Sequence, residues 1–392
     1  MSDDKKKIVY FDNNATTRVA PEVFEAMSPF LTELYGNASS VHAFGGQVER
    51  HIEKGRESLA ALLGADSREI IFTSCGTESD NAAIFSALHL CPTKRKVVVS
   101  KVEHPAVLNL GKELVRRGFE VAEVPVDAKG RLDMERLTEL VDDSTAVVSV
   151  MWANNETGNI YPVEEIAEIA KKHGALFHTD AVQAVGKIPI DLSNSNIDML
   201  SLSGHKIHAP KGVGALYVRR GVRFRPLIVG GHQERGRRAG TENVAGVVAL
   251  GKAAELAAMD MEIETTQVAA LRDRLEKGLR DAVPVTRVNG DSEHRLPNTT
   301  NVSFEYIEGE SILMLLDRLG ICASSGSACT TGSLEPSHVL RAMGVPYTAA
   351  HGAVRFSLSK YNTKEEVDFV IRELPPIIEW LRNLSPFWPP SE

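Results

Sequence analysis

The sequence predicts an α/β protein with a mostly parallel, doubly wound sheet in a large domain, together with a smaller α+β domain. From about residue 22 to residue 218, short apolar runs alternate with amphipathic stretches of helical length, the pattern of repeated strand–helix–strand units. After about residue 259 this alternation gives way to a long helix followed by mixed elements. We therefore place the large domain at residues 15–258 and the small domain at residues 1–14 and 259–392.

Apolar runs supply the predicted strands of the large domain. They are rich in Val, Ile, Leu and Phe without strict alternation, as expected for strands covered by helices on both faces. In chain order they are Glu69–Ser74, Lys96–Ser100, Ala146–Trp152, Ala175–His178, Met199–Ser203 and Gly214–Val218. A helix is predicted over Val163–His173, where Pro162 provides a start signal and Gly174 a stop signal.

The smaller domain is predicted from a different pattern. A long helix carries Val268, Leu271, Leu275 and Leu279 on one face, and the helix Gly246–Met259 joins it to the large domain. The remaining expected elements are the strand Thr300–Tyr306, the helix Ser311–Leu319, the strand Ala353–Ser359 and a final helix from Lys364.

Composition narrows the class of protein. The 392 residues include 44 Lys+Arg and 52 Asp+Glu, and 44 − 52 gives the formal charge of −8, which argues against binding to nucleic acid. The N-terminus lacks the apolar core of a signal peptide, and no apolar run is long enough for a membrane span, so we expect a cytoplasmic protein. The cysteines lack zinc-type or disulfide-type spacing and are Cys75, Cys91, Cys322 and Cys329.

Two predicted strands end beside residues that suit a bound cofactor. Asp180 follows one apolar run, and Lys206 follows another within the segment Ser-Gly-His-Lys. Ligands of open α/β sheets bind at the carboxyl ends of strands. The pair predicts a pyridoxal phosphate (PLP) site in which Lys206 forms the covalent link, Asp180 keeps the pyridine nitrogen protonated, and Gln183 donates to the phenolic oxygen. Taken singly, Lys206 could be a surface lysine and Asp180 a helix N-cap.

A turn between a strand and a helix would hold the phosphate of this cofactor. Residues 72–78 read Phe-Thr-Ser-Cys-Gly-Thr-Glu. Backbone N–H groups at a helix N-terminus near Gly76, with the Thr77 hydroxyl, suit an anionic group. A capping box without a ligand is the alternative. Cys75 in this turn is expected to be a small packed residue.

With these motifs the sequence resembles the PLP-dependent cysteine desulfurases, within the fold-type-I, class V aminotransferase-like group. The resemblance runs from the segment Asp-Asn-Asn-Ala-Thr-Thr at residues 12–17 to Leu-Ser-Pro at residues 384–386. Its most specific motifs are Ser-Gly-His-Lys at residues 203–206 and Ser-Ser-Gly-Ser-Ala-Cys at residues 324–329. Residues 151–158 and 230–241 look most like the nitrogen-fixation branch, the NifS type.

The resemblance implies roles for individual residues. Lys206 matches the lysine that binds the cofactor, and Asp180 and Gln183 match its ring partners. His104 matches the histidine that stacks on the cofactor and moves protons, and Cys329 matches the nucleophile that becomes a persulfide. The implied cofactor and substrate ligands are Gly76, Thr77, Ser203 and His205 for the phosphate, Thr241 from the other subunit of a homodimer, and Asn155 and Arg355, which hold the substrate, with Asn155 also beside the cofactor.

The implied reaction removes sulfur from L-cysteine and leaves L-alanine and a Cys329 persulfide. The sulfur would pass to a NifU-type iron–sulfur scaffold for cluster assembly, in a nitrogenase-related role. No resident metal is implied, and Cys329 would act only as a transient iron–sulfur ligand with that scaffold. Residues 324–333 contain nothing bulkier than Thr or Cys, so we expect a flexible, exposed loop with an accessible thiol. Cys322 lies in a strand-like run and is expected to be buried and inert.

Other functions remain open at this point. Another fold-type-I enzyme, such as a selenocysteine lyase or an aminotransferase, would share Lys206 and Asp180, but a transaminase would not need Cys329. A non-catalytic assembly protein could instead use Cys329 to bind a cluster or a partner. A lone cysteine argues against a stable cluster, which usually needs four protein ligands.

Overall fold

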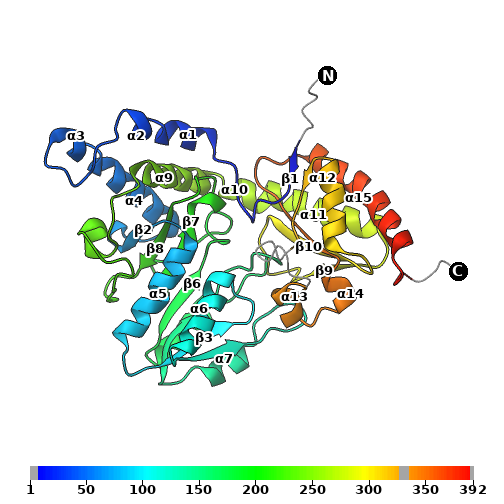
Figure 1. The fold of residues 1–392 in the computed structure, drawn as a ribbon, viewed down its shortest axis with the longest axis horizontal. Helices are drawn as coiled ribbons and strands as arrows, with labels where there is room; N and C mark the ends of the chain where they lie inside the picture. The colour runs from blue at the N-terminus through cyan, green and yellow to red at the C-terminus, as the bar shows by residue number, and fades with distance from the viewer. Residues whose placement is uncertain (1–7, 326–334, 389–392) are drawn as a thin grey trace.

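The computed structural model describes residues 8–325 and 335–388, and its largest element is a seven-stranded sheet (Figure 1). The strand order is β2-β8-β7-β6-β5-β3-β4. Only β8 runs antiparallel to its neighbours β2 and β7, and the other neighbouring pairs in this sheet are parallel. The strands are β2 (Ile70–Thr73), β3 (Lys96–Ser100), β4 (Glu120–Val124), β5 (Thr145–Ser149), β6 (Leu176–Asp180), β7 (Met199–Ser203) and β8 (Gly214–Val218). The predicted α/β class with a mostly parallel sheet is confirmed.

Helices cover both faces of this sheet, which explains why its central strands are buried at nearly every position. Ile71 and Leu216 pack on one face with residues of α5 and α6. Phe72 and Phe177 pack on the other with residues of α4, α8 and α9. The helices of this part are α1 (Pro21–Met27), α2 (Pro29–Thr32), α3 (Ala43–Gly46), α4 (Glu49–Leu63), α5 (Gly76–Leu90), α6 (Pro105–Arg116), α7 (Met134–Leu140), α8 (Val163–Lys172) and α9 (Val244–Met259).

The strands of the large sheet differ from the sequence predictions most clearly at β5, β6 and β4. Strand β5 ends at Ser149 rather than at Trp152, whereas β6 extends beyond the predicted His178 to Asp180. Strand β4 was not predicted from the sequence. It is an edge strand that pairs only with β3 and carries exposed glutamates at positions 120 and 123, so it lacks an apolar run.

A second unit surrounds a separate apolar core. Its sheets are antiparallel β12-β10-β9 and parallel β1-β11, with α11, α12 and α15 packed together in that core. The strands are β1 (Val9–Tyr10), β9 (Thr286–Asn289), β10 (Thr299–Phe304), β11 (Ile321–Cys322) and β12 (Ala353–Ser357). The helices are α10 (Met261–Ile263), α11 (Ala269–Ala282), α12 (Gly309–Arg318), α13 (His338–Ala342), α14 (Tyr347–Ala350) and α15 (Lys364–Leu384). The predicted domain boundaries stay a prediction, and Val339 and Leu340 of α13 pack into the core of the large sheet.

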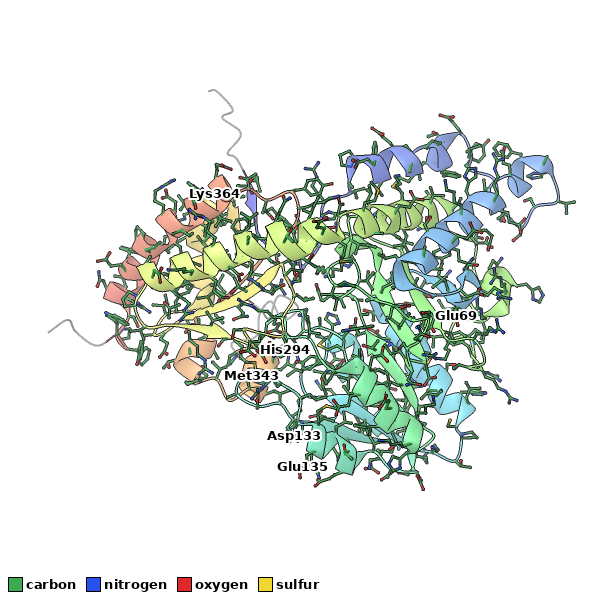
Figure 2. The ribbon with its side chains drawn as sticks, turned by 180° about the vertical axis from the view of Figure 1, so that it is seen from behind. Glu69, Asp133, Glu135, His294, Met343 and Lys364 are labelled. Atoms are coloured by element: carbon green, nitrogen blue, oxygen red, sulfur yellow. The ribbon has the colours of Figure 1, made fainter. Side chains whose placement is uncertain are left out.

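A row of helices connects the two units. Seen from behind, α9, α10 and α11 follow one another from the large sheet to the smaller one (Figure 2). A π-helical turn, Glu264–Val268, lies between α10 and α11. Over residues 8–325 and 335–388, none of the helices combines the length and the apolar character needed to cross a lipid bilayer.

Candidate functional site

A cavity of about 450 Å³ opens where strands β6 and β7 end and helix α5 begins. Parallel strands that end at the same edge of a sheet create such a crevice. Arg355 of β12 adds a wall from the second unit. The predicted residues that line it are Gly76, Thr77, His104, Asn155, Asp180, Gln183, Ser203, His205, Lys206 and Arg355.

Two predicted residues are not placed in this cavity. Thr241 is exposed, precedes α9, and does not line the cavity of its own chain. Its role across a subunit interface stays a prediction. Cys329 lies outside the described residues, so the expected loop around it is not tested.

The amine of Lys206 is held by the chain segment that follows β1. Lys206 is the last residue of the short 3₁₀ turn Gly204–Lys206, directly after β7. Its Nζ donates to the carbonyl oxygens of Asn14, at 2.5 Å, and Ala15, at 2.8 Å. The turn is tight because a Cβ on Gly204 would lie 3.0 Å from the Ala209 Cβ. This geometry fixes the lysine at the cavity wall.

Asp180 and His104 form the polar centre of the cavity. Asp180 ends β6, and its Oδ1 accepts a hydrogen bond from the Val182 N–H at 2.9 Å. Burial raises the pKa of Asp180, opposed by the hydrogen bond from the Val182 N–H and by the charge of Lys206. His104 is the N-cap of α6, and its Nδ1 accepts from the Ala106 N–H at 3.2 Å. Burial lowers the pKa of His104, so the imidazole is neutral with its proton on Nε2. A cationic ring nitrogen would compensate the buried Asp180 carboxylate.

Two observations indicate that the start of α5 can bind a phosphate group. Its N-cap, Cys75, provides no side-chain hydrogen bond, so the first N–H groups keep their capacity to bind an anion. The Ser203 Oγ also lines the cavity and is buried, with no hydrogen-bond partner among the described residues. Glu78, the acid of the first turn, is occupied by Ser74 and by Arg238 at 2.9 Å. The residues present therefore fit PLP, with Ser203 and the α5 terminus around its phosphate.

Arg355 presents a buried guanidinium to the cavity. Its Nη1 donates to the Asn155 carbonyl oxygen at 2.9 Å, and its Nη2 pairs with Asp12 Oδ1 at 2.8 Å. Its Nε is buried and has no partner in the described part of the chain. Guanidinium groups bind carboxylates with matched geometry, so Arg355 suits an amino-acid substrate.

The sequence analysis missed several residues of the cavity wall. Asp80 follows Gly76 by four residues on α5, a spacing that puts both on one helix face and could have indicated it. Burial and the nearby Asp180 charge raise the pKa of Asp80 well above its usual range. Asn14 and Glu156 also line the cavity, and burial raises the pKa of Glu156 to about 7. Both lie in segments that carried the family resemblance, without an assigned role.

Two expectations about cysteines were wrong. Cys322 does lie in a strand, but it is half-buried because β11 has two residues and pairs only with β1. Its partial burial still raises its pKa, which disfavours the reactive thiolate. Cys75 was expected to be packed, yet it is only partly buried, because it precedes the start of α5 and lines the cavity there.

Comparisons with known proteins agree with this geometry. The aminotransferase class-V family model matches residues 9–370. The chain is 63% identical, over 97% of its length and 95% of the relative, to a protein named cysteine desulfurase NifS from Azotobacter vinelandii. It is 62% identical to a cysteine desulfurase from Gluconacetobacter diazotrophicus, covering 97% of this chain and 96% of the relative. A solved NifS-like protein superposes with a TM-score of 0.90 at 44% identity, covering 96% of this chain and all of that one. A NifS-like protein from Rickettsia africae gives 0.85 at 32% identity, covering 95% of this chain and all of the other.

Proposed function

The chain belongs to the class-V aminotransferase family and is a cysteine desulfurase, and we propose that the cavity described above binds PLP together with L-cysteine. One observation carries this proposal: Lys206, Asp180 and Arg355 come from distant parts of the sequence and line a single cavity. The unpartnered Ser203 hydroxyl beside the uncapped start of α5 supports the phosphate end of the cofactor.

Lys206 and Asp180 would hold the two functional ends of the cofactor. Lys206 provides the amine for the covalent link, and Asp180 provides the carboxylate for the ring nitrogen. Gly76, Thr77, Ser203 and His205 would surround the phosphate, and burial lowers the pKa of His205 to about 4, which keeps it neutral. Bound PLP supplies an electron sink that allows the α-carbon of the amino acid to lose its proton.

Arg355 and His104 would act on the substrate. Arg355 binds the carboxylate of L-cysteine through its unoccupied Nε–H, and its contacts with Asn155 and Asp12 fix the guanidinium plane. His104, neutral and anchored at Nδ1, holds or moves a proton at Nε2, and the Lys206 amine takes up the α-proton.

Cys329 is the proposed sulfur acceptor. Its thiolate attacks the substrate sulfur, so that an S–S bond forms while the substrate S–Cβ bond breaks. The electron pair of that bond stays on the three-carbon fragment, which takes up a proton and leaves as L-alanine. One L-cysteine and one thiol thus give one L-alanine and one persulfide.

The described ends of the Cys329 segment support this reach. Ser324 forms a backbone bridge with Arg355, with the Ser324 carbonyl oxygen accepting from the Arg355 N–H at 2.6 Å. On the other side, Glu335 and Ser337 line the cavity. The four peptide links from Ser325 to Cys329 span at most about 14 Å. Described residues on both sides of this segment thus lie at the cavity wall or are bridged to it, which supports the proposed approach of the thiol to the substrate.

The remaining proposals concern partners and location. A homodimer would let Thr241 of one subunit contact the cofactor phosphate of the other. A NifU-type iron–sulfur scaffold would take the sulfur for cluster assembly, in a nitrogenase-related role and in the cytoplasm.

The test is incubation of the PLP-loaded protein with L-cysteine, followed by mass spectrometry of the Cys329 peptide. We expect a mass gain of one sulfur atom on Cys329. Cys329→Ala should keep the cofactor absorbance and its change on adding L-cysteine, yet release almost no sulfide. Cys91→Ala is the matched control and should keep full sulfide release. Sulfide production by Cys329→Ala at the unaltered rate would contradict the proposal.

A further inference from the structure

Lys187 is a buried lysine that the proposed chemistry does not use. Only 5% of the residue is exposed, and it follows Gln183 by four residues in the turns after β6. Its Nζ donates to the Gln183 Oε1 at 2.6 Å and to the Asn14 Oδ1 at 3.3 Å. Both acceptors belong to residues that line the cavity. Burying an ammonium group is costly, so two contacts with site residues indicate a purpose in the site.

The amine determines which way the Gln183 amide points. A charged lysine amine only donates, so it favours the amide orientation in which the oxygen faces it, as the contact with Oε1 has it. The NH₂ group of Gln183 is thereby directed to the other side, where Nε2 donates to the Asn14 carbonyl oxygen at 3.0 Å. That same carbonyl oxygen accepts from the Lys206 amine. The Gln183 NH₂ group and the Lys206 amine therefore both donate to the carbonyl oxygen of Asn14.

Asn14 is oriented by the same amine. Its Oδ1 accepts from Lys187 and also from the Asn298 Nδ2 at 3.0 Å. Its Nδ2 consequently donates to the Thr299 Oγ1, at 2.8 Å, and to the Asn155 carbonyl oxygen, at 3.2 Å. Asn14 thus has each of its side-chain polar atoms occupied. This fixes the position of the backbone carbonyl that Lys206 contacts.

The charge of Lys187 is balanced on the side away from the main cavity. Lys187 and Lys206 both line a second, small cavity of about 30 Å³, together with Glu264 of the π-helical turn. Burial lowers the pKa of Lys187 to about 7 and raises the pKa of Glu264 to about 7, and each charge opposes the shift of the other. Asp260, also at this cavity, is paired with Lys360 at 2.5 Å.

We propose that Lys187 is a positioning residue of the site, which fixes the Gln183 amide and Asn14 around Lys206 so that Gln183 presents a donor to the cofactor ring. The role toward the ring rests on the proposed function, whereas the orientation of the amide belongs to the protein without cofactor. Two measurements therefore separate the two claims.

The first measurement uses the apoprotein. The sequence contains four glutamines, Gln47, Gln183, Gln233 and Gln267, so labelling with [¹⁵N]glutamine gives few side-chain amide signals, and Gln183→Glu identifies the relevant one. We expect Lys187→Met to accelerate hydrogen exchange of the Gln183 NH₂ group by about tenfold, because the amide loses its anchored oxygen. Lys187→Gln keeps a donor and should stay within about twofold of the unaltered protein.

Lys360→Met is the matched control, because Lys360 lines the same small cavity and its amine donates to Asp260 rather than to Gln183 or Asn14. It should leave the Gln183 signal unchanged. The proposal is overturned if Lys187→Met leaves the exchange rate unaltered, if Lys360→Met accelerates it equally, or if Lys187→Gln exchanges as fast as a solvent-exposed amide.

The second measurement uses the PLP-loaded protein. The pH midpoint of the cofactor absorbance change should rise by about one unit in Lys187→Met, because a misoriented Gln183 no longer donates to the phenolic oxygen and a nearby cation is lost. An unchanged midpoint would overturn the role toward the ring. A loss of PLP binding by the unaltered protein would instead contradict the proposed function and would leave the apoprotein exchange result standing.

Discussion

Glu234→Gln should destabilise the protein strongly, because Glu234 forms a buried bidentate ion pair with Arg56 of α4. The Arg56 Nη1 lies 2.7 Å from Glu234 Oε2, and its Nη2 lies 2.9 Å from Oε1. Both side chains are at most 5% exposed. Removing one partner of a buried pair costs about 3–5 kcal/mol. Glutamine keeps one acceptor oxygen, so we expect a loss near the lower end, about 3 kcal/mol of unfolding free energy.

The local backbone adds to this loss. Glu234 and Arg235 adopt φ angles of 49° and 58°, in the left-handed region that costs a non-glycine residue about 1–2 kcal/mol. The ion pair holds them in this conformation. Glu234 Oε2 also accepts the Phe72 N–H at 2.9 Å, which fixes β2 just before the predicted phosphate site at Gly76. Glu234→Gln should therefore also weaken PLP binding.

Urea unfolding of the apoprotein, in a double-mutant cycle, measures this prediction. The double variant Arg56→Met with Glu234→Leu removes both charges and should recover most of the stability lost in Glu234→Gln. Glu139→Gln is the control, since its ion pair with Arg136 is exposed, and it should leave the unfolding free energy unchanged. A loss below about 1 kcal/mol in Glu234→Gln, or a double variant less stable than the single one, would refute the reasoning.

Three further predictions address the site and its surroundings. Arg355→Lys should raise KM for L-cysteine at least about tenfold, because lysine has no group in the place of the Nε–H and cannot keep the guanidinium contacts with Asn155 and Asp12, while the bound-PLP spectrum stays unchanged; an unaltered KM would contradict this. Asp180→Asn should lower the sulfide release rate at least about a hundredfold at saturating PLP, through loss of the charge on the ring nitrogen, and a rate within tenfold of the original would refute that role. Burial lowers the pKa of His178 to about 3, so the folded state does not bind the proton that the unfolded state binds below about pH 6.5, and stability falls as the pH falls. The stability advantage over His178→Asn in urea unfolding should narrow by about 2 kcal/mol from pH 7 to pH 5, and a constant gap would contradict this.

The sequence predicts best those strands whose residues are all buried in the same way. Strands β3 and β7 are buried at every position because helices cover both faces of the sheet, and their predicted bounds were confirmed to the residue. The edge strand β4 exposes two glutamates and pairs on one side only, so its sequence resembles a loop. Strand β4 forms by pairing with β3, and the local sequence of β4 does not reveal this pairing.

The sequence predicted those site residues whose type and position at the end of a strand already indicate their chemistry. Asp180 is the last residue of β6, and Lys206 lies in the turn after β7. Because β6 and β7 are parallel neighbours in the sheet, their carboxyl ends meet at one edge and bring the two residues together. Asp80 was missed because its place in the cavity wall depends on burial, which also raises its pKa beside Asp180. Burial of a helix residue at this depth follows from packing of α5 against the sheet.

The segment after β1 explains why the two units form one site. Asn14 contacts Lys206 and Gln183 of the large sheet, 192 and 169 residues away, and Thr299 of the smaller sheet, 285 residues away. Asp12, two residues earlier, pairs with Arg355. One short segment thus sets the amine that would bind the cofactor and the guanidinium that would bind the substrate. Because these contacts span most of the chain, the sequence shows the segment only as a family motif, and its positioning role emerges from the folded geometry.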